Sequence, residues 1–155
     1  MKADRDNLIN KMNDARQRLN AALDRIAPQA EIYPTWQLKQ LLDHITGWDE
    51  LVVSAFRAHS QGAISGVKMK LDAIDQYNAV SVDERRALSI EQSRQAYDNA
   101  RAAVILALQE MPAEKLDLRF RAPWGHMCTV SSVVKIFVSH ELEHARQIEA
   151  TLGPD

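Results

Sequence analysis

Near the end of the chain lies the stretch Ser139-His140-Glu141-Leu142-Glu143-His144-Ala145-Arg146, which carries two histidines four residues apart. The surrounding residues 129–152 are predicted to form a helix, because Thr129 is a suitable N-cap, apolar residues recur at helical spacing, and Gly153-Pro154 follows. Two histidines four residues apart on a helix lie on the same face, one turn apart. That face also carries Val133 and Phe137, so His140 and His144 are predicted to point into the protein.

The inward histidines have two interpretations. A helical His-x-x-x-His pair can hold one metal ion, whereas an inward histidine is more often a hydrogen-bonded core residue. A third ligand would favour the metal, and His44 is the candidate, because it lies in the apolar stripe of another predicted helix, between Leu41 and Trp48. Glu141 and Glu143 flank the inward face. We expect both to be exposed, the alternative being that one of them orients a ligand or accepts a proton.

Three more amphipathic helices are predicted upstream, over residues 4–27, 36–59 and 89–111. Thr35 can cap the second of these helices, and Ser89 with Gln92 forms a capping-box pattern at the start of the third. Pro112 then ends the third helix. His59 lies at the polar end of the second helix and is expected to be exposed.

Two connections, residues 62–88 and 112–128, are long enough to cover a site. In the first, residues 71–77 are predicted to form a short helical piece and residues 80–86 a loop or a further turn. In the second, Trp124 is expected to be an aromatic lid over the end of the bundle, the alternative being the wall of a pocket. His126 is expected to be a surface histidine, and the sequence around Cys128 gives little reason to expect a nucleophile there.

Length and composition limit the class of protein. The 155 residues predict one domain, 1–155, and the abundance of helix-forming residues favours an all-α fold. A formal net charge of -2 with interspersed charges gives no basic patch, so we expect no nucleic-acid partner. No apolar run is long enough to span a bilayer, the N-terminus lacks the apolar core of a secretion signal, and the single Cys128 fits a reducing compartment. We therefore expect a soluble, cytoplasmic protein without a membrane partner.

Four long helices and two long connections predict a single four-helix bundle. Within it, His44, His140 and His144 can converge if the helices that carry them are neighbours. Imidazole is a ligand for zinc, nickel, cobalt and ferrous iron. Three protein ligands leave one position open, as in catalytic zinc sites, for a water or a thiol that becomes a nucleophile at neutral pH.

Three segments together resemble the DinB-like superfamily: residues 41–50 (LLDHITGWDE), Pro123-Trp124-Gly125, and residues 140–148 (HELEHARQI). The resemblance implies a four-helix bundle with up-down-down-up topology and a long connection between helices two and three. It also implies a divalent metal ion, first of all zinc or nickel, on His44, His140 and His144. The relatives that it suggests are metal-dependent thiol transferases, mycothiol-dependent maleylpyruvate isomerases and proteins that protect their producers from genotoxic metabolites. The isomerases use a carboxylate where this chain has His140, which counts against that activity.

Three functions remain open at this point. The first is a metal-dependent enzyme, a thiol transferase or hydrolase, in which the three histidines activate a small thiol or water against an electrophilic small molecule. Trp48, Tyr77 and Trp124 are the residues expected to bind that substrate. The second is a metal-free hydrolase or a sequestration protein that holds a reactive small molecule in the bundle pocket. The third is a structural bundle that forms a homodimer through an apolar helix face.

Overall fold

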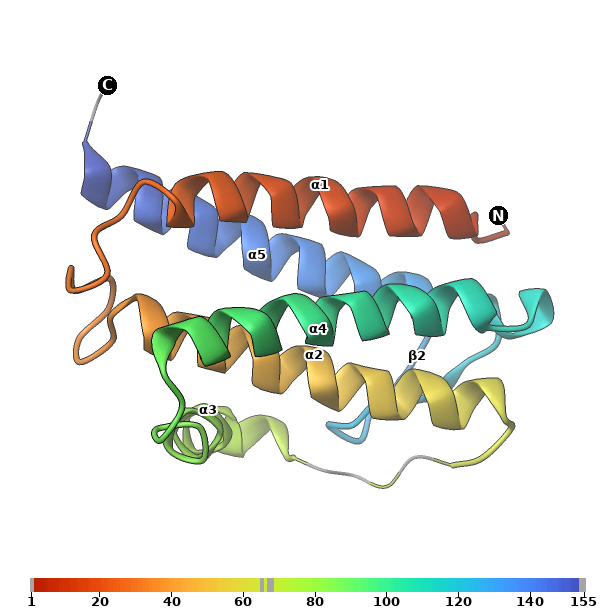
Figure 1. Ribbon diagram of the computed structural model, residues 1–155. Coiled ribbons are helices and arrows are strands. Elements are labelled where there is room, and N and C mark those ends of the chain that lie inside the picture. The colour runs from red at the N-terminus through yellow and green to blue at the C-terminus, as the bar shows by residue number, and fades with distance from the viewer. Residues whose placement is uncertain (1, 65, 67–68, 154–155) are drawn as a thin grey trace.

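The computed structural model describes residues 2–64, 66 and 69–153. Four long helices make up most of it: α1 (Arg5–Leu23), α2 (Leu38–Ser60), α4 (Ile90–Glu110) and α5 (Val130–Leu152). Figure 1 shows these four side by side, with α1 and α5 running in one direction and α2 and α4 in the other. The mostly helical architecture expected from the sequence is confirmed. None of the described helices is both long and apolar enough to cross a membrane.

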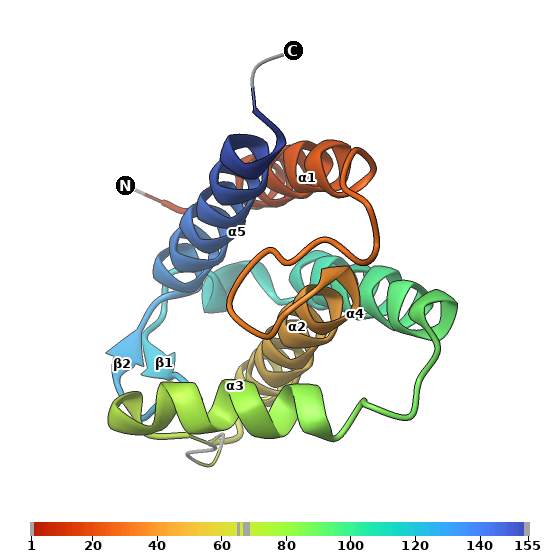
Figure 2. The same ribbon diagram turned by 90° about the vertical axis from the view of Figure 1, so that its left-hand side faces the viewer.

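The smaller elements lie in the two connections. In the first, a short 3₁₀ turn (Leu71–Ala73) leads into α3 (Ile74–Asp83), which runs across the direction of the long helices (Figure 2). In the second, another 3₁₀ turn (Ala113–Lys115) precedes a hairpin of two short antiparallel strands, β1 (Phe120–Arg121) and β2 (Met127–Cys128). The two pairs of long helices are α1 with α5 and α2 with α4.

The helix ends follow local capping rules in two of the three predicted cases. The Ser89 hydroxyl accepts a hydrogen bond from the Gln92 backbone N–H, and the Thr129 hydroxyl accepts one from the Ser132 N–H, as expected. The predicted cap Thr35 is wrong: it has a φ of 70° in the preceding turn, and Gln37 is the N-cap of α2. Helix α1 ends at Leu23, four residues before the predicted end, and Pro154 lies outside the described residues.

Helix α3 corrects a second prediction, because residues 80–83 are helical and not a loop. The reason is tertiary: α3 docks on α2 at Gly47, where a Cβ atom would overlap the Ser81 hydroxyl. The Tyr77 hydroxyl also donates a hydrogen bond to the Gly47 carbonyl oxygen, at 3.0 Å. Packing on α2 thus stabilises a helix whose own apolar pattern is weak.

The interior of the bundle contains two apolar clusters at different heights. The residues of the first cluster include Leu8, Met12, Val52, Phe56, Val104, Leu108, Val133 and Phe137. Those of the second cluster include Leu19, Leu23, Leu41, Ile45, Tyr97, Ala145 and Ile148. Each long helix contributes residues to both clusters, so the bundle buries one apolar stripe per helix, interrupted near the middle of each helix.

One charged residue from each long helix fills that interruption: Arg16 of α1, Asp49 of α2, Arg101 of α4 and Glu141 of α5. We call these four residues the buried charge layer. They are between 0% and 7% exposed. Arg16 Nη2 lies 2.9 Å from Asp49 Oδ2 and 2.7 Å from Glu141 Oε1, and Arg101 pairs with the same two carboxylates. Two arginines and two carboxylates cancel in charge, and each carboxylate is shared by both arginines.

The prediction that Glu141 is exposed is therefore wrong. Burial raises the pKa of the Glu141 carboxyl, but Arg101 and Arg16 lower it further, so the group is held ionised below its usual pKa range. Glu141 of α5 and Asp49 of α2 both accept hydrogen bonds from the two arginines on α1 and α4. The buried charge layer therefore fixes the positions of α2 and α5 relative to each other along the bundle axis.

Candidate metal centre

The structure brings the three predicted histidines together across the bundle, from α2 and α5. His44 lies in the second turn of α2, and His140 and His144 lie one turn apart on α5. The Nε2 atoms of His44 and His140 are 3.3 Å apart, and those of His140 and His144 are 2.9 Å apart. One ligand atom from each histidine lies within 4.8 Å of the other two.

This donor set fits a divalent metal ion. Zinc bound to imidazole nitrogens at about 2.0–2.1 Å in a tetrahedral arrangement places those nitrogens about 3.3 Å from one another. The Nε2 separations of 3.3 Å and 2.9 Å approach that edge length, and the three ligand atoms all lie within 4.8 Å of one another.

All three imidazoles are held in the neutral form that ligates metals. Burial, followed by the neighbouring His140 and His144, lowers the pKa of His44 to about 3. Burial and then His140 lower the pKa of His144 to about 3. Burial also lowers the pKa of His140, although Glu141 and Asp49 of the buried charge layer oppose the shift. At neutral pH no proton therefore competes for the lone pairs of these rings.

A chain of hydrogen bonds sets the orientation and tautomer of His144. The Gln147 amide nitrogen donates to Glu143 Oε1 at 3.1 Å, which turns its oxygen towards the hydroxyl of Tyr33. Because the Tyr33 hydroxyl donates to that oxygen, its own oxygen, 2.6 Å from His144 Nδ1, accepts the Nδ1 proton. His144 Nε2 is then left with a lone pair that points at the other two histidines. Glu143, half-buried, thus acts on a ligand through two intermediaries.

Replacing Tyr33 by phenylalanine is expected to weaken zinc binding by about 10- to 100-fold, the usual effect of losing the partner of a metal ligand. The substitution removes only the hydroxyl that accepts the His144 Nδ1 proton. Competition with a chromophoric chelator measures the affinity. Tyr77→Phe is the matched control, because its hydroxyl bonds to the backbone of α2 instead of a histidine. An unchanged affinity in Tyr33→Phe would contradict the role assigned to this hydroxyl.

The metal-free protein is expected to lose stability as the pH falls below about 6.5, the pKa of histidine in an unfolded chain. The folded protein keeps its three histidines neutral, so only the unfolded chain takes up protons in this range. Each histidine then lowers the free energy of unfolding by up to about 1.4 kcal/mol per pH unit. Urea unfolding at several pH values measures the slope. In His44→Phe the slope of the unfolding free energy against pH should decrease by the contribution of one histidine. A stability that does not depend on pH would contradict the lowered pKa values.

A cavity of about 220 Å³ lies beside two of the three histidines. His44 and His140 form part of its wall, and the other lining residues are Trp48, Ile74, Asn78, Ile136 and Phe137. The cavity is thus mostly apolar, with the side chain of Asn78 as its main polar group besides the imidazoles. Asn78 Oδ1 accepts a hydrogen bond from the Trp48 indole N–H at 2.8 Å, which fixes both side chains. An apolar pocket that ends at a cluster of convergent nitrogens is typical of a small-molecule site.

Of the three residues predicted to bind substrate, Trp48 lines this cavity directly. Tyr77 and Trp124 pack against Trp48, with ring centroids 5.3 Å and 6.3 Å from its own. Trp48 also lies 6.4 Å from the His140 ring, so it connects the other two aromatic residues to the metal centre.

The remaining candidate residues lie away from the metal centre. His126 is exposed, as expected. His59 is buried, which corrects the prediction that it is exposed: it stacks on Phe120 and donates from Nε2 to the Lys115 carbonyl oxygen at 2.8 Å. Burial raises the pKa of the Cys128 thiol, so Cys128 lacks the lowered pKa of a cysteine nucleophile.

A sequence model of the DinB superfamily matches residues 11–148. No curated protein matches the chain. Among solved structures, the mycothiol-dependent maleylpyruvate isomerase superposes with a TM-score of 0.75 at 11% sequence identity, over 94% of this chain and 61% of that one. This chain therefore spans about three fifths of the length of that isomerase.

Two other structures are similar over nearly their whole length. The colibactin self-resistance protein ClbS, solved in complex with double-stranded DNA, superposes with a TM-score of 0.77 at 15% identity, over 94% of this chain and 93% of that one. An uncharacterized protein from Clostridium difficile 630 superposes with a TM-score of 0.77 at 13% identity, over 97% of this chain and 96% of that one. At these identities the likeness establishes the fold and leaves the activity to be argued from the site.

Proposed function

The chain belongs to the DinB superfamily, and on this premise we propose that it is a divalent-metal-dependent enzyme that adds a small thiol, or water, to an electrophilic small molecule. One observation carries the proposal: three neutral imidazoles converge beside a mostly apolar cavity of about 220 Å³. His44, His140 and His144 are the proposed metal ligands, with zinc or nickel as the first candidates because imidazole suits both ions.

When bound, a divalent ion would supply the positive charge that lowers the pKa of a thiol or water enough to make it a nucleophile at neutral pH. Three protein ligands leave one coordination position free, and the cavity provides the space beside His44 and His140. Trp48, Phe137 and Ile136 would provide apolar surface for the substrate. We propose Trp48 as the direct substrate contact, held in place by Tyr77, Trp124 and Asn78.

A thiol is favoured over water as the nucleophile on two grounds. The cavity is predominantly apolar, which suits a weakly hydrated thiol better than it suits a water molecule and its hydrogen-bond partners. One structurally similar protein is a mycothiol-dependent isomerase. The small volume of the cavity limits both reactants to small molecules or to the reactive ends of larger ones.

The test is consumption of a small thiol, such as cysteine or glutathione, in the presence of the fluorogenic electrophile monobromobimane. The zinc- or nickel-loaded protein should accelerate the reaction, and both chelation and His140→Ala should abolish the acceleration. His126→Ala is the matched control, because it removes an exposed histidine and should leave the rate unchanged. Equal rates with the loaded protein, the metal-free protein and His140→Ala would contradict the proposal. Stoichiometric stabilisation by an electrophile without turnover would instead support a sequestration protein.

A further inference from the structure

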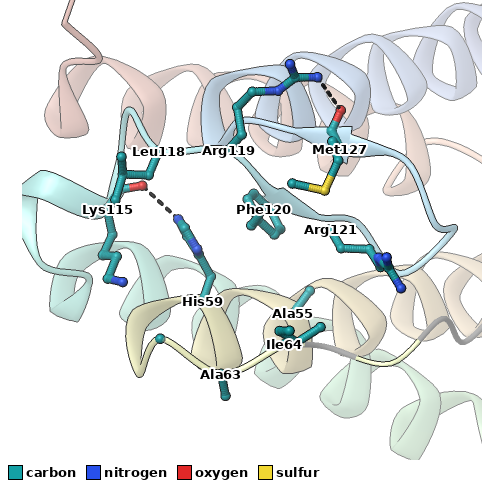
Figure 3. A pocket seen from close by; sticks show the side chains of 11 residues that line it. Ala55, His59, Ala63, Ile64, Lys115, Leu118, Arg119, Phe120, Arg121 and Met127 are labelled. Atoms are coloured by element: carbon teal, nitrogen blue, oxygen red, sulfur yellow. Dashed lines mark hydrogen bonds between the residues drawn. The ribbon is translucent and has the colours of Figure 1, made fainter.

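A second cavity, of about 300 Å³, lies between the last turns of α2 and the β1–β2 hairpin. His44 is near the start of α2, whereas this cavity includes Ala55 and His59 near its end, so the two cavities are at opposite ends of that helix. Figure 3 shows Phe120 in the middle of the cavity and His59 rising towards it from α2. The His59 and Phe120 rings stack with their centroids 4.5 Å apart, which gives the cavity a fixed aromatic wall.

Exposed apolar side chains gather around this cavity. Leu118 and Met127 are each 50% exposed, Ile64 is 84% exposed, and all three line it. They are three of the seven large apolar side chains found exposed among the described residues. Exposed apolar residues that are scattered singly need no explanation, but a cluster around a concave surface marks a place where an apolar group can bind.

The charged groups at the cavity are all cations. Lys115, Arg119 and Arg121 line it, and none of the described lining residues is acidic. Arg119 donates to the Met127 carbonyl oxygen, and Figure 3 shows its guanidinium turned away from Phe120. Lys115 and Arg121 lie on opposite sides of Phe120 in the same view, and their side chains make no ion pair with any described residue. The Lys115 ammonium lies over Gly62, 3.7 Å from where a Cβ atom of that glycine would stand.

We propose that this cavity binds a small amphipathic carboxylate, an apolar chain or ring that carries one negative charge. The apolar part would cover Leu118 and Met127, which are each half exposed, and so remove their exposed surface from water. The carboxylate would pair with Lys115 or Arg121, one on each side of Phe120, neither of which has an acidic partner among the described residues. The proposal does not depend on the reaction at the metal centre, because the two cavities share no lining residue.

Decanoate is the probe, titrated into the isotope-labelled full chain and followed through backbone amide resonances. Saturating shifts are expected for residues 118–121 and for Met127. Lys115→Gln combined with Arg121→Gln should weaken binding at least about tenfold, since neither cation is left to pair with the carboxylate. Arg94→Gln is the control, because it removes a cation near the start of α4 that pairs with Asp24 and does not line the cavity. This variant should bind decanoate as the parent does. Decanol, which lacks the charge, should bind more weakly than decanoate by a similar factor.

Three results would overturn the proposal. One is the absence of saturating shifts. Another is an affinity that the Lys115→Gln/Arg121→Gln variant does not change. The third is a set of shifts centred on His44 and His140, which would mean that the carboxylate binds at the metal centre and that the second cavity is not its site.

Discussion

Replacing Glu141 by alanine is expected to lower the free energy of unfolding by about 3–5 kcal/mol, the cost of leaving buried charges unpaired. Glu141 is 2% exposed and accepts hydrogen bonds from both Arg16 and Arg101. Without it, the two guanidinium groups would share only Asp49, deep in the bundle. Urea unfolding followed by far-UV circular dichroism, at a pH where Glu141 is ionised, measures the change.

The matched control is Glu149→Ala on the same helix. Glu149 pairs with Arg18 at the surface, where solvent screens the ion pair, so its loss should cost far less than the loss of Glu141. A double variant, Glu141→Met with Arg101→Met, should be less destabilised than Glu141→Ala, because it removes one cation with one anion and leaves Arg16 paired with Asp49. A loss below about 1 kcal/mol in Glu141→Ala would show that the layer is much less important for stability than its burial indicates.

Replacing His140 by alanine is expected to weaken zinc binding by about two to three orders of magnitude. The binding free energy of a structural zinc site with four ligands is about 10–16 kcal/mol, and the expected loss is one ligand's equal share of it. His140 lies between the other two histidines, with Nε2 contacts of 3.3 Å and 2.9 Å, so no remaining pair can reproduce the site. Calorimetric or chelator-competition titration of the purified variant measures the loss.

His126→Ala provides the control for the loss of a histidine as such, because His126 is exposed and lies outside the metal centre. It should bind zinc as the parent does. If His140→Ala retained the parent affinity while His126→Ala lost it, the ion would have to be bound elsewhere on the chain.

The helical periodicity of the sequence was sufficient to predict which histidines face inward, whereas their convergence also depends on how the helices pack. His44, His140 and His144 each occupy a position on an inward helix face, and in a bundle the inward faces must meet. The capping residues Ser89 and Thr129 could be predicted for a related reason, since a cap depends on neighbours in sequence alone. These features rest on local spacing, which one sequence displays in full.

Features that depend on contacts between distant segments were missed. Glu141 lies beside His140 in sequence, yet it faces the two arginines instead of solvent, and its partners come from α1 and α4. A signal did exist: Arg16, Asp49, Arg101 and Glu141 each interrupt an apolar stripe near the middle of a predicted helix. Four such interruptions, two of each sign, would have indicated a shared buried layer.

Tyr33 and Asn78 gave no comparable signal. Tyr33 comes from the connection before α2, and its bond to His144 spans 111 positions of the sequence. Asn78 belongs to α3, a helix that is stabilised by the contacts of its Tyr77 and Ser81 with Gly47 of α2 and that the apolar pattern did not fully predict. Positions of this kind become visible only when the fold places them beside the site.

The most direct test of the metal centre is X-ray absorption spectroscopy with elemental analysis, on protein purified without an affinity tag and incubated with zinc or nickel. The three-histidine site predicts about one ion per chain, coordinated by three imidazole nitrogens at about 2.0–2.1 Å for zinc. His44→Ala prepared in the same way should hold no ion. A parent protein that binds no ion after incubation, or whose ion has no imidazole ligands, would contradict the assignment of His44, His140 and His144 as the metal site.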